Sequence, residues 1–142
     1  MRAFVEPLQE LSEYGQMVKT ADGSTGLISI TGCIDSQKPH MMYAFGNGQK
    51  NKLIVTFNEQ KAKELYEEYR FFDPDTVYYP AKDVLFYQSD IRGNVLTAER
   101  INAIKAIREQ ERVTLVTTFD ALMNTMPPVE KTWSGIIRIA PG

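Results

Sequence analysis

The sequence has very little cysteine and histidine, which excludes several kinds of protein. Its 142 residues contain one cysteine, Cys33, and one histidine, His40. A single cysteine cannot form an internal disulfide, so a reducing, cytoplasmic location is expected. One cysteine and one histidine are too few soft ligands for a structural zinc site. We therefore expect no metal centre in this chain.

The chain also lacks a long apolar run and a marked excess of charge. No stretch approaches the ~20 apolar residues that cross a bilayer, and the N-terminal MRAFVEPLQEL does not have the pattern of a signal peptide. Sixteen Lys and Arg oppose 18 Asp and Glu, for a net charge of -2. A domain that coats nucleic acid usually has a strong basic excess. The composition, 43% hydrophobic, predicts one ordinary globular domain with no membrane contact.

Segments with a strand pattern alternate with segments with a helix pattern. Short apolar, β-branched runs predict strands at residues 27–31, 52–56, 76–79 and 113–117. Helical spacing, caps and chain breakers predict helices at residues 7–19, 39–45, 58–72, 96–111 and 120–126. Residues 81–94 have no clear period and are read as a structured connection. Because parallel strands need crossover connections, this order predicts an α/β fold, a parallel sheet with helices on both faces.

The loop after the first predicted strand lies where α/β sheets usually bind ligands. It runs from Gly32 to Lys38, the separation of the first glycine and the lysine in the P-loop pattern G-x-x-x-x-G-K-[ST]. Gln37 stands where that pattern has its second glycine, and Pro39 where it has Ser or Thr. The spacing favours a P-loop NTPase-like fold with a degenerate phosphate loop, and the alternative is a chance match in an ordinary surface loop.

Each departure from the pattern weakens nucleotide binding. A glutamine at position 37 resists the positive φ that lets a glycine curl the backbone around phosphates. Pro39 has no hydroxyl for Mg²⁺ and no backbone N–H for an anion. Asp35 adds a negative charge to a loop meant for an anion. We therefore expect no bound cofactor and no catalytic residue in this chain, although Lys38 can still attract an anion weakly.

Three segments, residues 27–38, 78–93 and 115–123, resemble the start of bacterial transcription-repair coupling factors. The middle one is the most specific, with Tyr-Pro-Ala-Lys-Asp followed by Phe-Tyr and then Asp-Ile-Arg. The N-terminus of that family is similar to the first domain of excinuclease B, a genuine P-loop ATPase module. The resemblance implies that residues 25–128 are a relic of such a module, preceded by a helix and loop at 1–24. Residues 129–142 are then the start of the next domain, or a C-terminal strand.

The resemblance also implies a parent protein and its partners. Coupling factors are large ATP-driven DNA translocases that displace stalled RNA polymerase and recruit excinuclease A, another component of the nucleotide-excision repair machinery. Their motor, with its ATP and Mg²⁺, lies downstream of this region, as do the domains that contact RNA polymerase and DNA. The surface for excinuclease A belongs to the second domain, so no partner-binding residues are assigned here. This chain is expected to be a non-catalytic support for the recruiting module that helps to restrain the motor.

Two other functions remain open from the sequence. The first is an active P-loop ATPase, such as a fragment of excinuclease B, and the second is an unrelated α/β binder of a small molecule. The remaining polar and aromatic features have structural explanations. Asp120 is expected to cap a helix, His40 to lie solvated at a helix start, and Cys33 to be buried. We expect the four aromatic residues of the 78–87 segment to pack in the protein interior; they are Tyr78, Tyr79, Phe86 and Tyr87. We expect the basic cluster late in the predicted 96–111 helix to complement the helix dipole; it consists of Lys105, Arg108 and Arg112.

Overall fold

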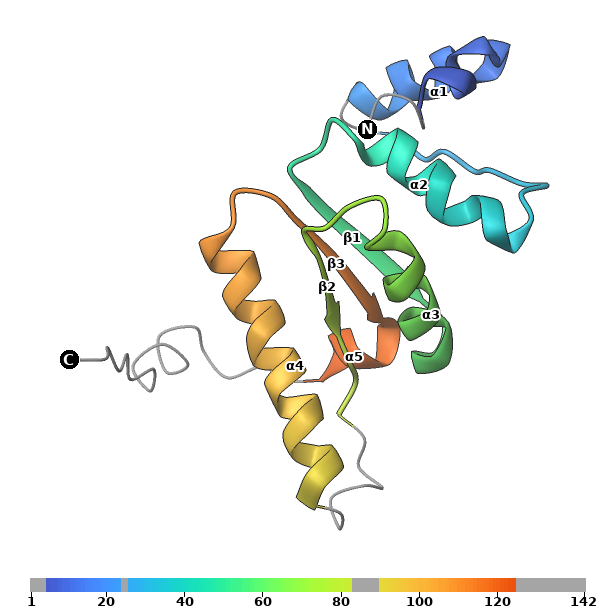
Figure 1. Ribbon diagram of the computed structural model, residues 1–142. Coiled ribbons are helices and arrows are strands. Elements are labelled where there is room, and N and C mark those ends of the chain that lie inside the picture. The colour runs from blue at the N-terminus through green and yellow to red at the C-terminus, as the bar shows by residue number, and fades with distance from the viewer. Residues whose placement is uncertain (1–4, 24–25, 83–89, 125–142) are drawn as a thin grey trace.

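The computed structural model describes residues 5–23, 26–82 and 90–124, and it contains a small sheet with helices around it (Figure 1). The chain begins with a 3-10 helix, Glu6–Glu10, and a second short 3-10 helix, Asp35–Gln37, precedes α2. The helices are α1 Ser12–Asp22, α2 Lys38–Gly46, α3 Glu59–Tyr69, α4 Asp90–Glu109 and α5 Phe119–Met123. The strands are β1 Asn51–Thr56, β2 Thr76–Tyr79 and β3 Val113–Thr118.

The three strands form one parallel sheet in the order β1-β3-β2. The last strand in sequence is therefore the central one, and Leu115 of β3 lies between Leu53 of β1 and Val77 of β2. Each of these strands lies within one or two residues of a predicted strand. The prediction of a parallel α/β sheet is confirmed for the part of the chain that the structure describes.

Consecutive residues of β2 show that helices cover both faces of the sheet. Tyr78 stacks on Tyr66 of α3, with ring centroids 5.7 Å apart. Tyr79 instead lies under Arg100 of α4, whose guanidinium carbon is 4.0 Å from the ring centroid. Because neighbouring residues of a strand point to opposite faces, α3 and α4 lie on opposite sides. The core on the α4 side is built from Tyr79, Ala103 and Ala121, all almost fully buried.

The predicted strand at residues 27–31 was wrong. The segment has no strand structure and no sheet partner among the described residues, and Leu27 is 96% exposed. A strand exists only when its backbone pairs with a neighbour. No described strand pairs with this segment, so its isoleucine-rich composition alone does not make it a strand. The described sheet has three strands rather than the four expected.

Several helix boundaries also differ from the prediction. The N-terminal helix is split, because the chain is extended at Leu11 between the 3-10 helix and α1. Helix α4 begins at Asp90, six residues earlier than predicted, and α5 ends three residues earlier. Residues 83–89, which include Phe86 and Tyr87, and residues 129–142 lie outside the described part, so the predictions for them stay predictions. In the described residues no helix is long and apolar enough to cross a membrane.

Candidate functional site at the strand ends

The Gly32–Pro39 loop lies beside the first turn of α3, at the carboxyl end of β1. Gly32 has a φ of +83°, a conformation that glycine adopts without strain. The chain then forms the 3-10 helix Asp35–Gln37 and enters α2. Lys61 of α3 lies 3.6 Å from the Asp35 carboxylate, which places the loop next to the first turn of α3. The strand that the sequence predicted before this loop is absent from the described sheet.

The lysine of the loop is held by a carboxylate of the same loop. Lys38 Nζ lies 2.6 Å from Asp35 Oδ1. The hydrogen bond and charge of Lys38, with a smaller contribution from Lys61, hold the pKa of Asp35 below its usual value. Both side chains of the Asp35–Lys38 pair are substantially exposed, so the pair contributes little to stability. The pair matters instead for anion binding, because the Asp35 carboxylate already occupies the place where Lys38 and Lys61 converge.

The backbone of the loop does not form a cradle for phosphates. Gln37 has a φ of -86°, not the positive φ of a P-loop glycine, and its N–H donates to the carbonyl of Ile34 at 3.0 Å. The Lys38 N–H donates to the carbonyl of Asp35. Pro39 is buried in the first turn of α2 and has no N–H. These residues do not fit a triphosphate with Mg²⁺, because amide groups that should face the anion are used within the loop or missing.

Glu59, which no sequence motif had indicated, joins the carboxyl ends of β2 and β3. It is the first residue of α3. Its Oε1 accepts hydrogen bonds from the Ala81 N–H at 2.9 Å and the Thr118 hydroxyl at 2.6 Å. Its Oε2 accepts a short hydrogen bond from the Tyr78 hydroxyl. These donors lie 19 to 59 residues away in sequence, so only the folded chain reveals the cluster.

A second polar cluster lies at the opposite, amino end of the sheet. Lys52 Nζ and Asp73 Oδ2 are 2.5 Å apart, and the Thr114 hydroxyl donates to the same carboxylate oxygen at 2.7 Å. Burial alone raises the pKa of Asp73, but the Lys52 and Thr114 donors outweigh it and hold the pKa below its usual value. The cluster anchors the turn before β2 to both other strands.

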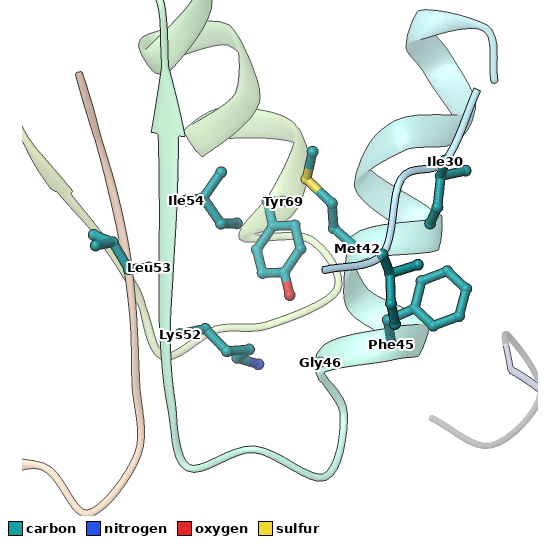
Figure 2. Close-up of a pocket in the computed structure, with 9 residues that line it drawn as sticks. Ile30, Met42, Phe45, Gly46, Lys52, Leu53, Ile54 and Tyr69 are labelled. Atoms are coloured by element: carbon teal, nitrogen blue, oxygen red, sulfur yellow. The ribbon is translucent and has the colours of Figure 1, made fainter. Parts of the chain in front are cut away.

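A groove of about 330 Å³ runs along the outer edge of β1 (Figure 2). Ile28 and Ile30 line one wall, and Leu53 and Ile54 line the other. Figure 2 shows the Tyr69 ring between Ile54 and the α2 residues, with its hydroxyl pointing towards the space between Lys52 and Gly46. The groove is mainly apolar, and nothing in the sequence pattern had predicted it.

Two other residues singled out in the sequence, Asp120 and His40, have surroundings that differ from the prediction. Asp120 does not cap α5, because the Thr118 side chain accepts the hydrogen bond from the Ala121 N–H instead. The cap prediction chose a residue two positions too late. His40 is half-buried and stacks on Phe72, with ring centroids 5.8 Å apart, rather than being solvated.

Two residues of the predicted basic cluster, one in α4 and one just after it, make contacts within the protein. Lys105 lies 3.9 Å from Glu109, and Arg112 donates to the carbonyl of Asn47 at 3.2 Å. Cys33 is half-buried, so its predicted full burial was wrong. Among the residues described, no group of three or more His, Cys, Asp or Glu side chains is placed to hold a metal ion.

Comparison with known proteins does not identify a relative. No protein-family model, no curated protein and no solved structure matches the chain.

Proposed function

We propose that this chain is the N-terminal, non-catalytic part of a transcription-repair coupling factor. In this proposal it is a relic of an excinuclease B-like ATPase module, and its work is to dock against other parts of the parent protein. The parent is an ATP-driven DNA translocase that displaces stalled RNA polymerase and recruits the excision machinery through excinuclease A. ATP and Mg²⁺ act in the downstream motor and not in this domain.

The observation that carries the proposal is the carboxylate inside the loop. Asp35 approaches Lys38 at 2.6 Å and Lys61 at 3.6 Å, so both cations face an internal anion instead of a γ-phosphate. The N–H groups of Gln37 and Lys38 are bonded within the loop, so they are not directed towards an anion. This is what a former nucleotide site would become in a domain whose role is contact.

The first test is a titration of a fluorescent ATP analogue with Mg²⁺ into the purified chain. We expect no saturation at millimolar nucleotide. The variant Asp35→Asn should gain weak affinity for the analogue, because it frees Lys38 and Lys61, and the double variant Asp35→Asn/Lys38→Ala should lose that gain. Saturable binding by the unmodified chain that disappears in Lys38→Ala would support the competing function, an active P-loop ATPase.

The second test uses the full-length protein. Deleting residues 1–128 should raise its basal ATPase activity, because the proposal assigns this domain a restraining contact with the motor. The matched control is Lys38→Ala in the full-length protein, which should leave ATPase activity and transcription-coupled repair unchanged. An unchanged ATPase activity after the deletion would refute the restraining role. Normal strand-selective repair after the deletion would refute the proposed place in repair.

A further inference from the structure

The face of the sheet that carries α4 is open over β1. Residues in register across a parallel sheet point to the same face, and Val55 is in register, through Thr117, with Tyr79. Tyr79 lies under Arg100 of α4, so Val55 faces the α4 side. Leu53, two residues earlier in β1, faces the same way. Helix α4 packs on β2 and β3, and Leu53 and Val55 remain 57% and 45% exposed. Parallel sheets are normally covered by helices on both faces, so β1 lacks a helix on this face in the part of the chain that the structure describes.

Helix α5 has the opposite imbalance. It buries Ala121 in the core beside Tyr79, on the same side of the sheet as α4. Its large apolar side chains are instead exposed, by 43% to 71%, and they are Phe119, Leu122 and Met123. Their i, i+3, i+4 spacing places them on one face of the helix. Helix α5 therefore presents an apolar stripe that no described element covers.

Phe57, which is 80% exposed, joins the open face of β1 to the stripe of α5. Thr56 of β1 is in register with Thr118 of β3. The next residues, Phe57 and Phe119, therefore follow neighbouring strand ends. The apolar patch consists of Leu53, Val55, Phe57, Phe119, Leu122 and Met123. With ~150–250 Å² for a whole aromatic side chain, the patch exposes on the order of 700 Å². That area exceeds the ~300–600 Å² of the largest patch on a typical monomer and is close to the ~800 Å² that each partner buries in a standard interface.

We propose that the apolar patch is the interface of a two-fold symmetric dimer of this chain. The patch contains both parts of a helix-on-sheet contact, a strand face without a helix and a helix stripe without a sheet. A two-fold axis places α5 of each copy on β1 of the other, so one symmetry operation covers both parts. No residue of the patch is charged, so the contact brings no like charges together, and the patch offers no cation to a nucleic-acid phosphate. The inference concerns this chain alone and does not depend on the proposed role in repair.

The first test is the molar mass of the purified chain, measured by sedimentation equilibrium over a concentration series. At about 100 µM we expect a mass approaching that of two chains, as for a dimer with a Kd of ~1–10 µM. Leu53→Lys should raise the Kd at least about tenfold, because the dimer buries its ammonium against α5 of the other copy. The matched control is Val95→Lys on α4, outside the patch, where the wild-type residue is 54% exposed; it should leave the Kd unchanged. A chain that is monomeric at every concentration, or a Leu53→Lys variant that dimerises like the wild type, would overturn the proposal.

A mixing experiment tests the reciprocal contact of α5 with β1. Leu122→Asp should weaken the dimer as Leu53→Lys does. An equimolar mixture of the two variants should dimerise again, because one contact keeps both leucines and the other pairs the introduced lysine with the introduced aspartate. A mixture that stays monomeric would refute this geometry. Hydroxyl-radical footprinting of Phe57 and Phe119 tests the other occupant. If the chain is monomeric and the two rings are protected only in the full-length polypeptide, another part of the parent covers the patch and the dimer is refuted.

Discussion

At the scale of the residue, the Lys52–Asp73 pair has surroundings that bury charge. The two side chains are 12% and 13% exposed. Such a pair is costly to form but also costly to break, since removing one partner leaves an uncompensated buried charge. The pKa of Asp73 lies below its usual value of 3.8 because Lys52 and Thr114 donate to the ionised carboxylate.

The first prediction concerns the variant Asp73→Asn. At pH 7 it should lower the free energy of unfolding by about 2 kcal/mol, because Lys52 loses its anion. A carboxyl whose folded pKa is depressed stabilises the protein above its unfolded pKa and loses that contribution as pH falls through the folded pKa. The difference between wild type and variant should therefore be complete above about pH 4 and shrink below it. Urea unfolding at a series of pH values measures this.

Its matched control is Asp75→Asn. Asp75 is an exposed acidic residue two positions away, and its variant should change stability by less than about 0.5 kcal/mol at every pH. If both variants lost the same stability, or if the Asp73→Asn loss persisted at acidic pH, the ion pair would not be its cause.

The second prediction concerns Glu59. Its carboxylate accepts hydrogen bonds from three donors, so Glu59→Gln brings an NH₂ group against at least one of them. We expect a loss of about 1–3 kcal/mol in the free energy of unfolding. Glu67→Gln, on the exposed face of the same helix, should be nearly neutral. Chemical denaturation followed by circular dichroism compares the two, and similar losses would show that the three hydrogen bonds of Glu59 contribute no specific stability.

Sequence reasoning located some of these residues and missed others for a physical reason. Gly32 and Lys38 were singled out because the P-loop spacing is local and can be read from residues only six positions apart. Glu59 was missed because its partners come from two other strand ends. A half-buried acid at the first turn of α3 leaves only a weak sequence trace, since Asp and Glu are common there anyway.

At the scale of the element, the helix ends are set by side-chain caps. The Asn58 side chain accepts a hydrogen bond from the Lys61 N–H at 2.7 Å, as its place before α3 had predicted. Thr118 does the same for α5, and it also donates to Glu59. Thr118 therefore contributes two hydrogen bonds to the fold, one that caps α5 and one to Glu59.

The third prediction compares caps at the start of α3. Asn58→Ala should cost about 1 kcal/mol, while Asn58→Asp should cost little because an aspartate accepts the same hydrogen bond. Thermal unfolding of both variants is the measurement. Equal stability of Asn58→Ala and the wild type would mean that tertiary packing alone determines where α3 begins.

The elements that were predicted well carry their information locally. Strand β1 is a short apolar run, β3 is a β-branched run, and the apolar stripe of α3 recurs at helical spacing. Residues 27–31 have equally strong composition and still form no described strand, because pairing depends on a neighbour that composition cannot reveal. The early start of α4 at Asp90 was missed because the 81–94 segment contains Gly93 and no regular apolar stripe.

At the scale of the whole molecule, α1 and α2 are joined to the sheet layer by aromatic contacts. Tyr43 of α2 meets Tyr69 edge-on, with centroids 6.5 Å apart, and stacks with Phe72 at 5.7 Å. On the other side of α2, Tyr14 donates to the carbonyl of Ala44. Because Tyr43 contacts two of these rings at once, we expect it to couple the unfolding of α1 and α2 to that of the sheet layer.

The fourth prediction is that Tyr43→Ala uncouples the two layers. The lost burial and ring contacts should cost about 3 kcal/mol. Unfolding should also stop being a single transition, with α1 and α2 exchanging their amides before the sheet does. Tyr66→Ala is the control, because Tyr66 also stacks on a tyrosine but lies within the α3 layer. A single transition in both variants would contradict the prediction.

The sheet order also decides when the fold can first exist. Strands β1 and β2 pair only with β3 in the described sheet, and β3 is the last of the three to be synthesised. A chain leaving the ribosome at ~5–20 residues per second therefore carries β1 for several seconds with none of its described strand partners made. During that interval its apolar side chains are available to chaperones and to neighbouring nascent chains. The yield of this domain in a cell should therefore follow the pace of translation through residue 118, even if the finished fold is unchanged.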